Sequence, residues 1–143
     1  MDQASGTPPV ARAVRIMHGA LVAGVLLVGG VFFSLLRIRG QAPATGRTLG
    51  VALAAVSIGL VLVAASVLRR RVPERRPEQS PDAYWAAVES RGPAIVLWAV
   101  TEGASLISLV GYFLSGATAP AAAAAVAIAM LILYRPSHLE GAA

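Results

Sequence analysis

The 143-residue sequence has no cysteine and no lysine, and only 13% of its residues are charged. Without cysteine there is no disulfide framework, thiolate zinc site, iron–sulfur ligation or cysteine nucleophile. The charged fraction is about half the roughly 25% of soluble domains, whereas 57% of the residues are hydrophobic. A soluble chain of this length buries only about two-thirds of its surface. The composition therefore indicates a membrane protein and disfavours a soluble enzyme, a disordered tail or a nucleic-acid module.

Four apolar segments are long enough, or nearly so, to cross a hydrocarbon layer about 30 Å thick as helices. They are residues 16–36, 48–68, 93–114 and 119–134. The fourth is short, so we expect it to stand nearly upright or to extend past Arg135. The sequence predicts an all-α membrane protein with four transmembrane helices in two hairpins, residues 16–68 and 93–134.

The basic residues, all of them arginine, predict the orientation of these helices. With four crossings, three arginines (Arg37, Arg39 and Arg47) fall in the first loop, and the other nine fall on the opposite side. Those nine are Arg12, Arg15, Arg69, Arg70, Arg71, Arg75, Arg76, Arg91 and Arg135. Because arginine is enriched on the cytoplasmic side, we expect both termini in the cytoplasm. The arginine- and alanine-rich composition is typical of a GC-rich bacterial genome, which favours the bacterial inner membrane.

A cleaved signal peptide is the alternative interpretation of the first apolar segment. The segment is longer than the apolar region of such peptides, and Arg37 and Arg39 follow it at once. We therefore expect no cleavage. The tail before it, residues 1–15, and the tail after the fourth helix, residues 135–143, are predicted to be cytoplasmic, and the first ten residues have the composition of a disordered tail.

The linker between the hairpins, residues 69–92, is predicted to hold a short helix. Its first part is charged and contains two prolines, so we expect an extended chain there. Ser80-Pro81-Asp82 is typical of a helix start, with serine as the cap, proline at the first position and an acid in the first turn. We expect this helix to end near Ser90, before Gly92-Pro93 breaks the chain.

This short helix is expected to lie in the cytoplasmic membrane interface. Tyr84 and Trp85 would anchor it at headgroup depth, because aromatic rings collect there. Arg69, Arg70 and Arg71 would contact phospholipid headgroups beside it.

Glu102 is the one carboxylate inside a predicted membrane segment. An ionised carboxylate near the bilayer midplane costs on the order of 3 kcal/mol. We therefore expect it to be protonated, paired or next to a wet cavity. Hydroxyl side chains at helical spacing form a stripe that Glu102 flanks, namely Thr101, Ser105, Ser108 and Tyr112.

Glu102, Ser105 and Ser57 form the candidate proton- or ion-binding site. Ser105 lies one turn from Glu102, and Ser57 lies at a similar depth in the second segment. The alternative interpretation is that Glu102 is a neutral carboxylic acid whose hydrogen bonds lock the helix packing.

His18 lies one turn inside the cytoplasmic end of the first segment, with no second strong metal ligand at its depth. We expect it to bond a headgroup or a backbone carbonyl. Pigment or haem ligation by His18 alone stays open, since one axial imidazole suffices. We predict no metal and no cofactor, although bound lipid is expected.

Small residues recur four positions apart, which lets helices approach closely in lipid. The pairs are Ala20 and Gly24, Gly30 and Ser34, Gly50 and Ala54, and Ala55 and Gly59. They favour tight packing within the chain or against neighbouring proteins.

Residues 98–112, Trp-Ala-Val-Thr-Glu-Gly-Ala-Ser-Leu-Ile-Ser-Leu-Val-Gly-Tyr, resemble the carboxylate-bearing helix of the ATP synthase c subunit, the rotor proteolipid. Arg91-Gly92-Pro93 is similar to the Arg-x-Pro loop of that family. The resemblance implies that Glu102 carries an ion. It covers about 25 residues and departs from the family, since the loop lies closer to the carboxylate. The whole chain resembles small four-span bacterial membrane proteins, which implies fold and location only.

Motifs of phosphate binding, dinucleotide binding, zinc proteases and serine hydrolases do not occur in the sequence, so we expect no enzyme. The sequence favours a non-catalytic accessory or structural subunit of a larger bacterial inner-membrane complex. Its expected partners are membrane lipids and other integral subunits, not nucleic acid. The alternative is a proton- or cation-translocating, proteolipid-like subunit that uses Glu102.

Overall fold

The computed structural model describes residues 9–39 and 44–141, so most of the predicted N-terminal tail lies outside the described residues. Within these two ranges all regular structure is helical, which confirms the all-α class. The helices are α1 (Val10–Arg39), α2 (Ala44–Val63), a π-helical turn (Ala64–Leu68), α3 (Arg69–Arg71), α4 (Pro81–Ala86), α5 (Val88–Ser115), α6 (Thr118–Leu133) and α7 (Pro136–Leu139).

Among the described residues, three helical stretches are long and apolar enough to cross a membrane, so the chain is a multi-pass membrane protein by length and composition. They are Val10–Ile38, Gly46–Arg71 and Val88–Ser115. The second joins α2, the π-helical turn and α3 without a break. α6 is a shorter apolar helix of 16 residues, which ends at Leu133 and does not continue past Arg135. Four crossings therefore remain a prediction.

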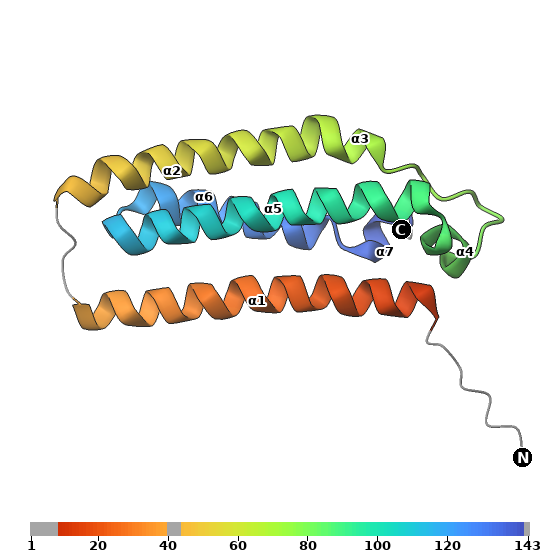
Figure 1. Cartoon of the computed structure of the whole chain (residues 1–143), viewed down its shortest axis with the longest axis horizontal. Helices are drawn as coiled ribbons and strands as arrows, with labels where there is room; N and C mark the ends of the chain where they lie inside the picture. The colour runs from red at the N-terminus through yellow and green to blue at the C-terminus, as the bar shows by residue number, and fades with distance from the viewer. Residues whose placement is uncertain (1–8, 40–43, 142–143) are drawn as a thin grey trace, which may run out of the picture.

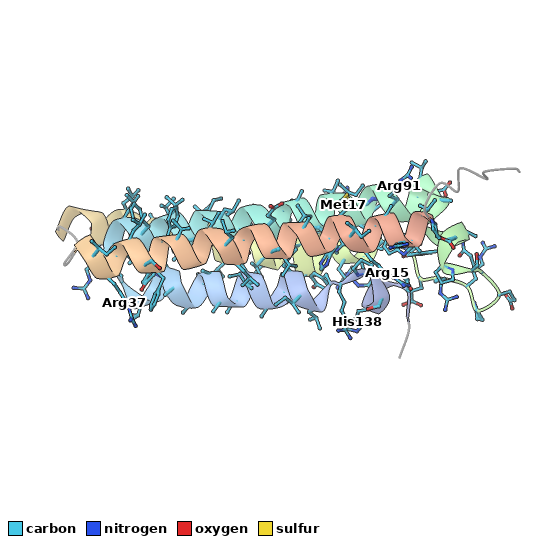
Figure 2. The ribbon with its side chains drawn as sticks, turned by 90° about the horizontal axis from the view of Figure 1, so that it is seen from below. Arg15, Met17, Arg37, Arg91 and His138 are labelled. Carbon is cyan, nitrogen blue, oxygen red and sulfur yellow. The ribbon has the colours of Figure 1, made fainter. Side chains whose placement is uncertain are left out.

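The four long helices lie side by side (Figure 1). α2, α5 and α6 pack on one another, whereas α1 packs mainly on α5. The start of α1, the linker, α4 and α7 meet at one end of the bundle, and the end of α1, the start of α2 and the α5–α6 connection lie at the other. The nine arginines predicted on one side all belong to the first end, which we call the arginine end. Figure 2 shows Arg15 and Arg91 there and Arg37 at the opposite end.

Helices α2 and α5 lie in close contact where two glycines face each other. A Cβ atom on Gly50 would lie 3.0 Å from the carbonyl oxygen of Gly111, and one on Gly111 would lie 3.2 Å from Cβ of Leu53. Of the predicted small-residue pairs, Gly50 and Ala54 thus lie at a helix contact. By contrast, Cβ atoms on Gly24, Gly30 and Gly59 would meet no atom within 4 Å.

The helix start in the linker is as predicted, but the break that follows is not. The Ser80 hydroxyl oxygen accepts a hydrogen bond from the Ala83 N–H at 3.2 Å and caps α4, with Pro81 at the first position. The chain then turns at Ala87, whose ψ is 130°, and α5 runs through Pro93. The predicted break at Gly92-Pro93 is wrong, because the proline lies in the second turn of α5. Its ring lacks an N–H, so α5 lacks one backbone hydrogen bond there and nevertheless continues as a helix.

Candidate functional site

The polar stripe of α5 points into the bundle. Thr101, Ser105 and Ser108 are all fully buried, which confirms the predicted direction of the stripe for these three residues. Thr101 Oγ1 donates to the Leu97 carbonyl at 2.7 Å, and Ser105 Oγ donates to the Thr101 carbonyl at 2.9 Å. The hydroxyls of Thr101 and Ser105 therefore bond to backbone carbonyls of their own helix.

Ser57 links two helices, but not through Glu102. It is fully buried on α2, and its hydroxyl donates to the Ala104 carbonyl of α5 at 2.8 Å. Because Ser105 also donates to a backbone carbonyl, the structure does not join Ser57, Ser105 and Glu102 into one hydrogen-bonded network.

Glu102 lies halfway along α5 at the edge of the stripe and is half-buried. In the part of the chain that the structure describes, its carboxyl group makes no hydrogen bond or ion pair. It is therefore available to bind a proton or a cation, or to accept a hydrogen bond from another molecule.

His18 is buried on α1, and its Nε2 lies 3.0 Å from the Leu131 carbonyl of α6. A carbonyl only accepts, so Nε2 carries the proton and donates. This is the carbonyl bond expected of His18, and it leaves Nδ1 as the ring nitrogen with a free lone pair. The edge of the ring also packs against Trp98, with centroids 5.0 Å apart.

The carbonyl groups at the end of α6 are satisfied by three aromatic N–H groups. Besides His18, Nδ1 of His138 donates to Leu133 at 2.8 Å, and Nε1 of Trp98 donates to Tyr134 at 2.7 Å. The last carbonyls of a helix have no partner within it, and leaving them unpaired in lipid costs several kcal/mol each. These side chains thus allow a short apolar helix to end against its neighbours.

A second polar cluster at the arginine end, here called the Glu140 cluster, consists of Arg15, Arg75, Trp85 and Glu140. The Glu140 carboxylate, 4% exposed, accepts from Trp85 Nε1 at 2.7 Å and forms an ion pair with Arg15 at 2.8 Å. Arg75 Nε donates to the Glu140 backbone carbonyl at 3.0 Å. The cluster therefore ties α1, the linker, α4 and the residue that follows α7 together.

Sequence reasoning missed the Glu140 cluster. Its other members lie 55 to 125 residues from Glu140 in the chain, so no local spacing signals the cluster. A nearby contact also joins residues that are distant in the chain. Asp82 accepts from the Ala11 N–H at 2.9 Å and caps the start of α1.

The rings of Tyr84 and Trp85 are buried in protein, which differs from the predicted headgroup anchors. The ring centroids of Trp85 and Trp98 lie 5.8 Å apart, and the Tyr84 hydroxyl donates to the Pro73 carbonyl at 2.7 Å. Burial raises the pKa of that hydroxyl above its ordinary value, so the hydroxyl keeps its proton.

The three arginines predicted to anchor the linker are not buried. Arg69 is half-buried and donates to the Val72 carbonyl at 3.3 Å, while Arg70 and Arg71 are exposed. They stay available for headgroups.

Residues within the described ranges line two surface grooves between neighbouring helices. One of about 690 Å³ lies between α2 and α6 and is lined by apolar residues that include Ala55, Gly59 and Ala122. The other, of about 360 Å³, lies between α1 and α6 and ends at His18 and Arg135. Across residues 9–39 and 44–141, no three His, Asp or Glu side chains gather as a metal site.

No family model, curated protein or solved structure matches this chain. The resemblance of residues 98–112 to the rotor proteolipid therefore stays an expectation. One part of it is altered by the fold, since Arg91-Gly92-Pro93 lies within α5 and not in a loop.

Proposed function

We propose that this protein is a non-catalytic integral subunit of a larger bacterial inner-membrane complex, in which α1 packs against a helix of a neighbouring subunit. In this proposal α6 is the fourth crossing, and the arginine end lies in the cytoplasm because it carries nine arginines.

The observation that carries this proposal is the exposure of α1. Only 6% of its most apolar stretch is buried, against 50% for α5. Such a helix is placed at the edge of its own bundle, where it has an apolar surface left for another molecule.

The outward side of α1 suits another helix. Ala20, Gly24 and Ser34 are exposed on it, and Leu27 stands 68% exposed among them. A Cβ atom on Gly24 would meet nothing within 4 Å. Small residues let helix backbones approach closely, which is the main way helices associate in lipid.

We expect a photoreactive amino acid at Leu27 to crosslink to one protein of fixed mass in native membranes. The control is Leu62, which is similarly exposed at 62% but lies on α2, across the bundle from α1 (Figure 1). Adding Gly24→Leu should remove the Leu27 adduct by filling the close-approach surface, without disturbing the fold. Lipid adducts alone at Leu27, or an adduct that Gly24→Leu leaves unchanged, would contradict the proposal.

A second candidate function, proton or cation translocation through Glu102, is supported by one observation. The carboxyl group is half-buried at the middle of a membrane-length helix and has no partner among the described residues. Carboxylates at such positions commonly carry protons or ions.

A hydrophobic carbodiimide is expected to label Glu102 in native membranes, because it reacts with protonated carboxyl groups within lipid. Glu102→Gln should lose the label and the proton flux into vesicles. Glu89→Gln, an exposed carboxylate at the start of α5, should leave both unchanged. Absence of labelling at Glu102 would remove this candidate.

A further inference from the structure

The groove between α1 and α6 combines an apolar trough with a positive charge at one end. Val22, Ala23 and Leu26 of α1 and Ile132 of α6 line it, and Arg135 lies where α6 has just ended. Gly19 widens it, since a Cβ atom there would meet nothing within 4 Å.

The Arg135 side chain is available to a ligand. It is exposed, and its guanidinium group has no hydrogen bond or ion pair within the described ranges. By contrast, His18 at the same end already uses Nε2 on the Leu131 carbonyl, so it serves as a wall of the groove and not as a donor to the ligand.

We infer that this groove binds an anionic phospholipid, with an acyl chain along the trough and the phosphate on Arg135. An arginine holds phosphate through two parallel hydrogen bonds. A negatively charged headgroup is favoured there over a zwitterionic one.

A lipid fits this groove better than a protein helix does. The groove has about 360 Å³, roughly half the volume of the groove between α2 and α6. A helix with its side chains is about 10 Å across and would meet the guanidinium group of Arg135 without a phosphate to pair it. The larger groove has no charged residue in its lining, so it should not distinguish headgroups.

The test is to titrate the purified full chain in detergent with phosphatidylglycerol or phosphatidylcholine of the same acyl chains and to count bound lipids by native mass spectrometry. Phosphatidylglycerol should bind more tightly. Arg135→Gln should weaken its binding about fivefold, to the phosphatidylcholine level, because one arginine near a headgroup contributes about that factor. Ala23→Leu, an exposed position in the trough, should weaken both lipids.

Two variants serve as matched controls. Arg70→Gln removes an exposed arginine from the same end, and Ala122→Leu fills the groove between α2 and α6; neither should change the preference for phosphatidylglycerol. Equal losses with Arg135→Gln and Arg70→Gln would overturn the inference, as would unchanged binding in Ala23→Leu. A photoreactive group at Ala23 that crosslinks to a protein helix in native membranes, in place of lipid, would overturn it too. The inference does not depend on the crosslink at Leu27 or on the role of Glu102.

Discussion

Glu140→Ala is expected to lower the free energy of unfolding by about 2–3 kcal/mol. The change removes the acceptor of the Trp85 indole N–H, and Trp85 is 0% exposed, so no water replaces it. An unsatisfied buried donor costs about 1–3 kcal/mol. The ion pair with Arg15 adds less, because the Arg15 side chain is 51% exposed and water screens its charge.

Thermal unfolding of the full chain in detergent, followed by tryptophan fluorescence, measures this effect. Glu140→Gln should lose only part of the stability, because the amide oxygen still accepts from Trp85. Arg15→Gln should cost less than 1 kcal/mol on the same reasoning. Glu78→Ala, at an exposed linker position, should change nothing. If Glu140→Ala unfolds no more easily than Glu78→Ala, the Glu140 cluster does not hold the arginine end together.

The positions of the four apolar helices could be predicted from sequence because uninterrupted apolar runs are a local property. Their ends were less predictable. α1 begins at Val10, six residues before the predicted start, and α5 begins at Val88 instead of Pro93. Helical structure continues through polar residues such as Arg12 and Arg91 once the chain leaves the apolar region, so hydropathy alone does not locate the end.

Which face of each helix meets its own chain could be predicted only for α5. There, hydroxyl residues at helical spacing marked the buried side, and the structure confirms it at Thr101 and Ser105. Between Gly19 and Phe33 every face of α1 is apolar, and leucine is equally stable against lipid and against another helix. The sequence therefore could not tell that Gly24 faces outward whereas Gly50 of α2 faces α5.

The partners of the predicted site residues depended on distant segments. Ser57 was predicted to reach across to the third segment, but its acceptor is the Ala104 carbonyl and not Glu102. Tyr84 and Trp85 have the composition of an interfacial anchor, yet they are buried because α1 and the C-terminal residues cover them. Such contacts are set by the packing of whole helices, which no short pattern encodes.

Gly50→Ala is expected to destabilise the protein by about 1–3 kcal/mol, the usual cost of overpacking a close contact. The added methyl group would lie 2.6 Å from Cβ of Ser115 and 3.0 Å from the Gly111 carbonyl oxygen. Neither neighbour moves freely. Ser115 donates to that same carbonyl at 2.7 Å and accepts from the Ala117 N–H at 3.1 Å, so it holds the turn between α5 and α6.

Gly59→Ala on the same helix provides the matched control, because its added methyl group would meet no atom within 4 Å. Alanine favours a helix over glycine by up to about 1 kcal/mol, so this variant should be as stable as the parent or slightly more stable. Denaturation of both variants in detergent measures the change in the free energy of unfolding. Opposite signs of this change in Gly50→Ala and Gly59→Ala separate the effect of packing from that of helix propensity. If both substitutions raise stability equally, α2 and α5 do not make the close contact at Gly50, and the arrangement of α5 around its polar stripe would have to be revised with it.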